Sequence, residues 1–485
     1  MARFGIRRDI VMTYAHRSLR ALAICLVSFA LAQQSAHAQI GGGGGNTIGG
    51  GPTAGVAVDA DGVLKRVMAN DPTGDLARQR VQEALTKLDR DVARRSPLRK
   101  VSLTRLEKVM KERIATGQPI DDVMQHLAGL TRLQYVFCYP ESGDVVIAGP
   151  AEAWGQAPSG RFQGIESGRP VLELQDLVTA LRTFPPNANN KKPFIFCSID
   201  PTQEGLSQMQ QFLRQMRGRI GNPAQNPGQD QFIVENLREK LGMQTITIGG
   251  ISPKTHFAQV MVEADYRMKL IGIGLEVPPV HLTSYVDRAK PTQVSSNALQ
   301  RWYFVPNYQC VRVSEDALAM EMVGEGVKLV GEDEVVAGDG KRQKSGGRVN
   351  QASDSFVKAF TKVYPKLAEQ APVYAQLRNC IDMAVAAAFI QHQDYYDLAK
   401  WTPETISSEK AYPVETLNPP QQVETAVNAL WRGNTFITPI GGGVQMRPTE
   451  AVSATNLLED GDKKVKEART AIDLSKLGAD QWWWD

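Results

Sequence analysis

The residues best placed for chemistry lie on one amphipathic segment in the middle of the chain. His256, Glu263 and Arg267 are seven and eleven residues apart, which places them within about 40° of one another around a helix. Asp265 and Lys269 fall on the far side of that helix. Each acid is followed by a base four residues later, which predicts ordinary ion pairs, at the surface or between domains. The alternative is that His256 and Glu263 line the edge of an active site.

A second polar group follows two predicted strands. Asp200 comes directly after the apolar run Phe194–Ile199, and the loop Gly249–Ser252 follows the run Thr245–Ile248. In parallel α/β sheets, ligands gather beyond the carboxyl ends of the strands. Asp200 also begins a typical helix-capping sequence, so capping is the competing explanation. The weak candidates for acid, base or metal roles in a hydrolase are Asp200, His256 and Glu263.

The chain contains no motif that by itself defines an activity. It has neither a His-Glu-x-x-His zinc helix nor a Gly-x-Ser-x-Gly nucleophile elbow. Gly272–Val277 lacks the third glycine of a dinucleotide loop and ends a helix instead of opening one. His126, His281 and His392 have no local ligand spacing. The sequence therefore predicts no cofactor and no metal site, and leaves any metal site to be assembled by the fold.

The candidates are positioned by a strand and the helix that follows it. Thr245–Ile248 predicts a buried strand, Gly249-Gly250 a turn, and Ser252-Pro253 the beginning of a long helix. Apolar residues at helical spacing give this helix one buried stripe. The stripe residues are Phe257, Val260, Met261, Ala264, Met268 and Ile271.

The predicted fold class lies between α/β and α+β, with a mixed sheet flanked by helices. Alternating helices and strands over residues 171–277 favour parallel pairing of consecutive strands. From Asn297 to Val336 the apolar period changes to two, which predicts an antiparallel meander. Near the N-terminus, three helical segments precede two apolar runs, Leu133–Tyr139 and Asp144–Ala148, that are split by a turn.

Composition divides the chain into five parts. Glycine and proline accumulate over residues 155–170, which predicts a boundary there. The parts are a signal peptide at 1–38, a Gly-rich linker at 39–55, a smaller N-terminal helix-plus-hairpin domain at 56–154, a central domain at 168–401 closed by two helices, and an irregular Pro/Gly-rich tail at 402–485 with one weak helix at 423–431.

The first 38 residues have the layout of a secretory signal. Basic residues precede an apolar run, and Ala36-His37-Ala38 suits a signal peptidase that would leave Gln39 as the new N-terminus. Met1 and Met12 are alternative starts. No later apolar run reaches the roughly 20 residues of a membrane-spanning helix. Periplasmic or secreted localisation is therefore predicted.

Loss of the leader changes 55 basic and 52 acidic residues to 50 and 51. A nearly neutral chain has no general attraction for nucleic acid, so no nucleic-acid partner is predicted.

The sequence leaves two alternatives open for the four cysteines and two for the C-terminal tryptophans. Cys138, Cys197, Cys310 and Cys380 remain after loss of the leader, and they either form two disulfides of undetermined connectivity or are buried free thiols. Trp482, Trp483 and Trp484 end the chain in a row. They dock either on the protein's own surface or on an envelope partner.

Three stretches resemble a family of exported planctomycete bacterial proteins, a domain of unknown function. They are Gly168–Phe184 (GRPVLELQDLVTALRTF), His256–Lys269 (HFAQVMVEADYRMK) and Val373–Asp382 (VYAQLRNCID). The resemblance extends over residues 55–401. It implies an envelope or secreted location and brings no activity or site residues.

These observations favour a non-enzymatic exported protein with a binding or structural role in the cell envelope. The alternative is a hydrolase that acts on an envelope or extracellular substrate. A third possibility is a partner-docking protein that uses the tryptophan tail. Convergence of the three candidate side chains in one buried cleft would favour the enzyme.

Overall fold

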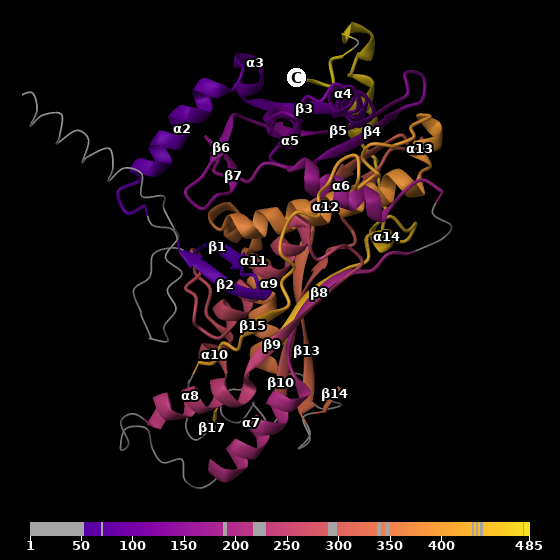
Figure 1. Cartoon of the computed structure of the whole chain (residues 1–485). Coiled ribbons are helices and arrows are strands. Elements are labelled where there is room, and N and C mark those ends of the chain that lie inside the picture. The colour runs from indigo at the N-terminus through magenta and orange to yellow at the C-terminus, as the bar shows by residue number, and fades with distance from the viewer. Residues whose placement is uncertain are drawn as a thin grey trace, which may run out of the picture. The chain divides into compact units, whose positions relative to one another are not determined.

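Two open sheets, with helices packed on them, form the computed structural model of the chain (Figure 1). It describes residues 53–68, 71–187, 192–216, 229–289, 298–336, 341–344, 350–428, 431–432, 435–436, 440–478 and 480–485. The predicted signal peptide and nearly all of the Gly-rich linker lie outside these ranges.

The larger sheet, sheet A, has the strand order β1-β2-β15-β9-β8-β18-β10-β13-β14. Its strands are β1 (Thr53–Val58), β2 (Val63–Met68), β8 (Ile195–Pro201), β9 (Met243–Gly249), β10 (Ala298–Pro306), β13 (Val327–Val336), β14 (Arg342–Lys344), β15 (Gln422–Glu424) and β18 (Ile440–Met446).

The smaller sheet, sheet B, has the order β19-β11-β12-β4-β5-β3-β20. Its strands are β3 (Ser96–Ser102), β4 (Tyr135–Tyr139), β5 (Asp144–Ala151), β11 (Val311–Val313), β12 (Ala319–Met322), β19 (Leu458–Glu459) and β20 (Trp483–Trp484). Two further antiparallel pairs are β6 (Trp154–Gln156) with β7 (Phe162–Gly164), and β16 (Trp431–Arg432) with β17 (Thr435–Phe436).

Helices lie between and around the sheets. The longer ones are α2 (Asp75–Lys87), α4 (Leu103–Ala115), α6 (Leu174–Thr183), α7 (Gln203–Met216), α8 (Gln229–Leu241), α9 (His256–Gly272), α11 (Gln351–Gln370) and α12 (Pro372–His392). The shorter ones are α3 (Arg90–Ala93), α5 (Asp122–Gln125), η1 (Leu127–Gly129), α10 (Tyr285–Arg288), α13 (Tyr395–Leu398), α14 (Pro448–Ala451), α15 (Lys464–Thr470) and η4 (Leu474–Lys476).

The mixed pairing confirms the predicted fold class. In sheet A, β18 runs parallel to β10 and antiparallel to β8. The predicted hairpin of β4 and β5 also forms, and β1 and β2 form a second antiparallel hairpin. The segment from Thr402 onward is largely irregular, but its short strands join both sheets. The helix expected over residues 423–431 is replaced by β15, whose pairing with β9 supplies backbone hydrogen bonds that a weak helix could not.

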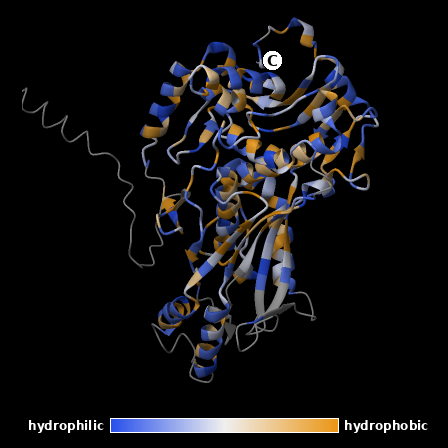
Figure 2. Ribbon diagram, turned by 45° about the vertical axis from the view of Figure 1, so that its right-hand side comes forward, coloured by the Kyte–Doolittle hydropathy of each residue, from blue (hydrophilic) through white to orange (hydrophobic). Residues whose placement is uncertain are grey.

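The expected parallel pairing of β8 and β9 is wrong, because these strands are antiparallel. Two helices connect them instead of one. α7 and α8 pack on each other through a small apolar cluster that includes Leu206, Phe212 and Leu237. Both helices contain hydrophilic and hydrophobic residues along their length (Figure 2). α7 leads away from the end of β8 and α8 leads back toward it. β9 therefore begins beside the end of β8, and the two strands are antiparallel.

The predicted meander over residues 297–336 is also wrong. β10 pairs with β13 in sheet A, whereas β11 and β12 pair with each other in sheet B. The intervening hairpin crosses between sheets, since β12 pairs with β4. Both sheets therefore contain strands from either side of residues 155–170, where the sequence predicted a domain boundary.

The predicted core helix, α9, is buried as expected. Phe257 and Met261 are both 0 % exposed, and the other residues of the predicted stripe are buried with them. α9 packs on β8, β18, α6 and α12. Thr255 caps it by accepting a hydrogen bond from the Ala258 N–H, so it begins three residues after the predicted start.

Candidate functional site

The charged residues of α9 are buried, whereas the sequence favoured ion pairs at a surface or between domains. Glu263 is 4 % exposed and Asp265 is 0 % exposed. Because an unpaired buried charge is strongly disfavoured, each must have a partner. The partners come from different elements and divide the three candidate residues among separate clusters.

Asp200 belongs to a cross-strand ion pair. Its Oδ2 accepts a hydrogen bond from the Arg301 guanidinium of β10 at 2.9 Å. β18 lies between β8 and β10, and a side chain at Gly441 of β18 would meet Asp200 Oδ1 at 2.6 Å. The Asp200-Pro201-Thr202 sequence leads into α7, where the hydroxyl of Thr202 accepts a hydrogen bond from the Gly205 N–H.

The strand-end hypothesis for Asp200 and the Gly249–Ser252 loop also fails on geometry. Because β8 and β9 are antiparallel, Asp200 pairs with Thr245 while Gly249 pairs with Phe196. The two groups therefore lie at opposite ends of the strand pair. Gly250 has a structural role, since its φ is +83° and a Cβ would lie 2.2 Å from the Phe194 carbonyl oxygen.

Glu263 lies in a chain of buried ion pairs. Its carboxylate accepts hydrogen bonds from Arg161, which follows β6, and from Arg267 at 3.4 Å. Arg267 also donates from Nε to Glu276 at 2.8 Å. Burial lowers the pKa of Arg267, but the charge of Glu276 outweighs this and raises it. The predicted pairing of Glu263 with Arg267 is confirmed, and its function is to join α9 to other elements.

The second predicted pair on α9, Asp265 with Lys269, is likewise confirmed and buried. Lys269 Nζ donates to Asp265 Oδ2 at 2.7 Å and to the carbonyl oxygens of Ile199 and Gly442 at 3.0 and 3.2 Å. Burial raises the pKa of Asp265 to about 6, and Lys269 opposes that shift. The pair ties α9 to β8 and β18.

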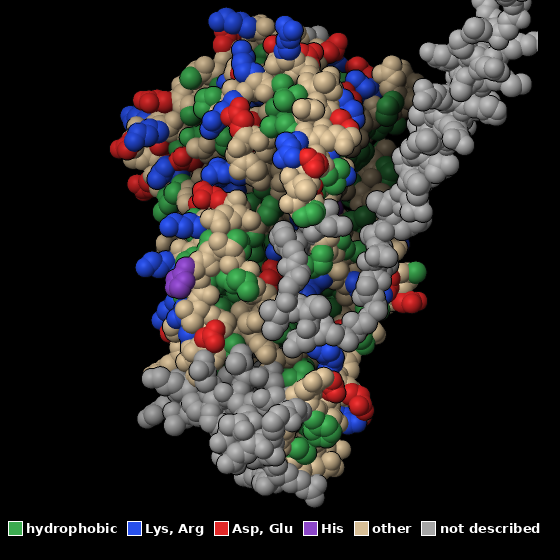
Figure 3. All heavy atoms as spheres, turned by 90° about the vertical axis from the view of Figure 1, so that its left-hand side faces the viewer, with side chains coloured by type: hydrophobic (Ala, Val, Ile, Leu, Met, Phe, Trp, Pro, Cys, Tyr) green, Lys and Arg blue, Asp and Glu red, His purple; other side chains and the backbone are tan. Residues whose placement is uncertain are grey.

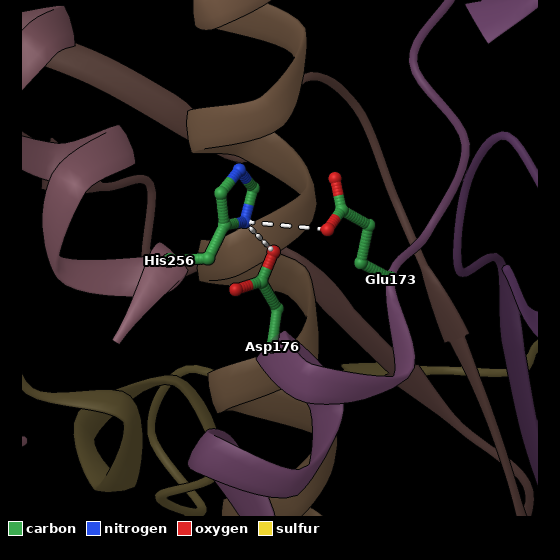
Figure 4. Close-up of side chains that lie close together, drawn as sticks. All are labelled: Glu173, Asp176 and His256. Atoms are coloured by element: carbon green, nitrogen blue, oxygen red, sulfur yellow. Dashed lines mark hydrogen bonds and ion pairs between the residues drawn. The ribbon is translucent and has the colours of Figure 1, made fainter. Parts of the chain in front are cut away.

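His256 meets two carboxylates that the sequence did not single out. Its Nδ1 lies 2.9 Å from Asp176 Oδ2 and 3.7 Å from Glu173 Oε2 (Figure 4). Asp176 is in the first turn of α6 and Glu173 directly precedes that helix. Figure 4 shows both carboxylates turned toward one side of the imidazole ring. The cluster joins the N-terminal ends of α6 and α9.

Electrostatics make this cluster favourable for a cation. Burial lowers the pKa of His256, but attraction to Asp176 and Glu173 outweighs it and raises the pKa to about 9. Burial raises the pKa of Asp176, opposed by His256. Both shifts favour a proton held between the two side chains. An imidazole and two carboxylates that can share a proton are also potential ligands of a metal ion.

The sequence missed Glu173 and Asp176 because Asp176 and His256 are 80 positions apart. No local spacing links them. The available signal was an acid on the apolar side of α6, beside Leu177, where a polar residue requires a partner. Chemically, the cluster can act as an ion pair, as an acid–base pair or as a metal ligand set. Asp200 and Glu263 do not contact it among the described residues.

The other predicted features have structural explanations. All four cysteines are buried and free, so no disulfide forms among the described residues. β20 of the tryptophan tail pairs with β3, and Asp485 forms an ion pair with the fully buried Arg99 at 2.8 Å. The tail thus docks on the protein's own sheet. On the face in Figure 3, acidic and basic side chains are interspersed.

The described part of the chain has no helix long and apolar enough to cross a membrane. A family model described as a protein of unknown function (DUF1598) matches residues 197–285. The chain thus contains such a domain, which runs from β8 through α9 to the start of α10. Searches of curated proteins and of solved structures found no match to this chain.

Proposed function

We propose that this protein is a non-enzymatic, exported protein with a binding or structural role in the envelope of a planctomycete-type bacterium. The observation that carries the proposal is the pairing of the candidate residues. Asp200 is paired with Arg301, and Glu263 with Arg161 and Arg267. The Asp200–Arg301 pair joins β8 to β10, and the Glu263–Arg161 pair joins α9 to the segment between β6 and β7, as expected of side chains that stabilise a scaffold.

Export is supported by the leader, with its apolar run and its Ala36-His37-Ala38 sequence. The test is expression of the full chain in a bacterial host, cell fractionation, and N-terminal sequencing. We expect an envelope or secreted product that begins at Gln39. The control is Ala38→Leu, which should leave the leader uncleaved. Recovery of wild-type protein in the cytosol with its leader intact would contradict the proposal.

A hydrolase acting on an envelope or extracellular substrate is the second candidate. One observation favours it: the His256 side chain is 20 % exposed and faces two carboxylates, an arrangement suited to acid–base chemistry. Wild-type protein and a His256→Gln variant should be assayed on ester, phosphoester, peptide and glycan substrates. Hydrolysis that His256→Gln abolishes without lowering the melting temperature would replace the first proposal.

A further inference from the structure

Glu173, Asp176 and His256 form a set of ligand atoms close enough to share one ion. Each residue offers one atom, and these atoms all lie within 4.8 Å of one another. They come from two separate elements, since Glu173 and Asp176 belong to the start of α6 and His256 begins α9. Their convergence in Figure 4 depends on the packing of those helices.

The second oxygen of Asp176 gives an independent indication of a ligand. Asp176 is 4 % exposed, and its Oδ1 is buried with no hydrogen-bond partner among the described residues. Buried carboxylate oxygens are nearly always satisfied, so an orphan of this kind requires an explanation. A cation bound by both oxygens of the Asp176 carboxylate would provide one. Glu173 Oε2 accepts a hydrogen bond from Gln175 Nε2 at 2.6 Å, and a carboxylate oxygen has a second lone pair for an ion.

The spacing of these atoms fits a first-row metal ion. Zinc bonds to nitrogen and oxygen ligands are about 2.0–2.2 Å long, which puts tetrahedral ligand atoms roughly 3.4 Å apart. The distances from His256 Nδ1 to Asp176 Oδ2 and Glu173 Oε2 are 2.9 and 3.7 Å, on either side of that value. All three ligand atoms lie within 4.8 Å of one another, so side-chain rotations would bring them to the distances of a bound ion.

The donor set selects the class of metal. One imidazole nitrogen with two carboxylate oxygens suits zinc and its neighbours, whereas magnesium and calcium prefer oxygen alone. We propose that Glu173, Asp176 and His256 bind one divalent transition-metal ion of the zinc class. Three protein ligands leave a position for water, and the partly exposed His256 side chain provides access from solvent. This site stands whether or not the protein is an enzyme.

Isothermal titration of the metal-free mature chain with zinc chloride tests the proposal. We expect one zinc ion per chain, retained in excess magnesium. His256→Gln and Asp176→Asn should each weaken zinc binding by at least about 100-fold, because loss of a direct ligand costs more than the roughly 10- to 100-fold of outer-shell changes. His281→Gln and Asp397→Asn, at exposed positions, are the matched controls and should bind zinc as wild type does.

Thermal melting shows whether a variant has lost zinc binding only because it no longer folds. Zinc should raise the melting temperature of the wild type and of both controls, and leave that of a folded His256→Gln variant unchanged. The proposal is overturned if the wild type binds no zinc at 100-micromolar concentrations. It is also overturned if His256→Gln binds zinc as tightly as the wild type, or if magnesium displaces the zinc.

Discussion

Some charged side chains of this protein are buried away from solvent. Asp382 of α12 is an example beyond α9, since its side chain is 0 % exposed and lies 3.5 Å from Arg132. Burial raises the pKa of Asp382 to about 6, and the nearby Arg132 and Arg378 oppose the shift. Such a group makes folding stability depend on pH.

The Asp382 shift predicts a loss of stability as pH rises from about 4 to about 6. Below pH 4 the carboxyl is protonated in both states, while above it only the unfolded state ionises at first. Wild type should lose up to about 3 kcal/mol through this group, and Asp382→Asn should not. Melting temperatures measured from pH 4 to pH 7 should therefore show a variant-minus-wild-type difference that grows with pH and levels off above about 6.

The exposed Asp354→Asn variant is the control for that series, because its side chain is 42 % exposed in an i,i+4 pair. Its difference from wild type should not vary with pH in this way. A difference for Asp382→Asn that stays constant, or that shrinks as pH rises, would rule out the account of its burial.

Sequence spacing predicted some of these side-chain partners and not others. The i,i+4 pairs of α9 were predictable because one helix sets their geometry. The partners of His256 were not, since Asp176 reaches it from a helix 80 positions away. Partners of that kind depend on tertiary packing, which hydropathy period does not encode. Burial of the ion pairs was missed for the same reason.

Among the elements, the apolar period identified the main helices and about half of the described strands. It did not identify strand partners. β8 and β9 were expected to be parallel, but the α7–α8 hairpin between them reverses the chain. β3 was missed because Arg99 and Lys100 look like surface residues, although the Arg99 side chain is buried and bonded to backbone carbonyls and Asp485.

We expect the glycine-rich strand β18 to tolerate no added side chain at its centre. It lies between β8 and β10, and a Cβ at Gly443 would be 1.8 Å from the Cys197 carbonyl oxygen. Backbone cannot yield by that much in the middle of a sheet, so Gly443→Ala should destabilise the protein by about 3 kcal/mol or more. Thermal melting should show a loss of several degrees.

Gly461→Ala is the control for β18, since a Cβ there meets nothing within 4 Å. It should melt within about a degree of wild type. If Gly443→Ala melts there as well, the placement of β18 at the centre of sheet A is wrong.

At the scale of the whole molecule, the two sheets are assembled from segments distant in the sequence. β1 and β2 join sheet A through β15, and the tail completes sheet B through β20. α9 occupies the middle of this arrangement with its charges paired inward. We propose that these paired charges hold the fold together and do not take part in a reaction.

Unfolding of a Glu263→Gln variant tests that claim most directly. Its matched control is Glu369→Gln, whose side chain is 56 % exposed in a pair with Arg169. Because the variant leaves the largely buried Arg161 without its carboxylate partner and Arg267 with Glu276 alone, we expect a loss of about 3–5 kcal/mol, or roughly 3–5 °C in Tm for a chain of this size. An unchanged or higher Tm, as for a carboxylate kept for chemistry at a cost in stability, would contradict the account.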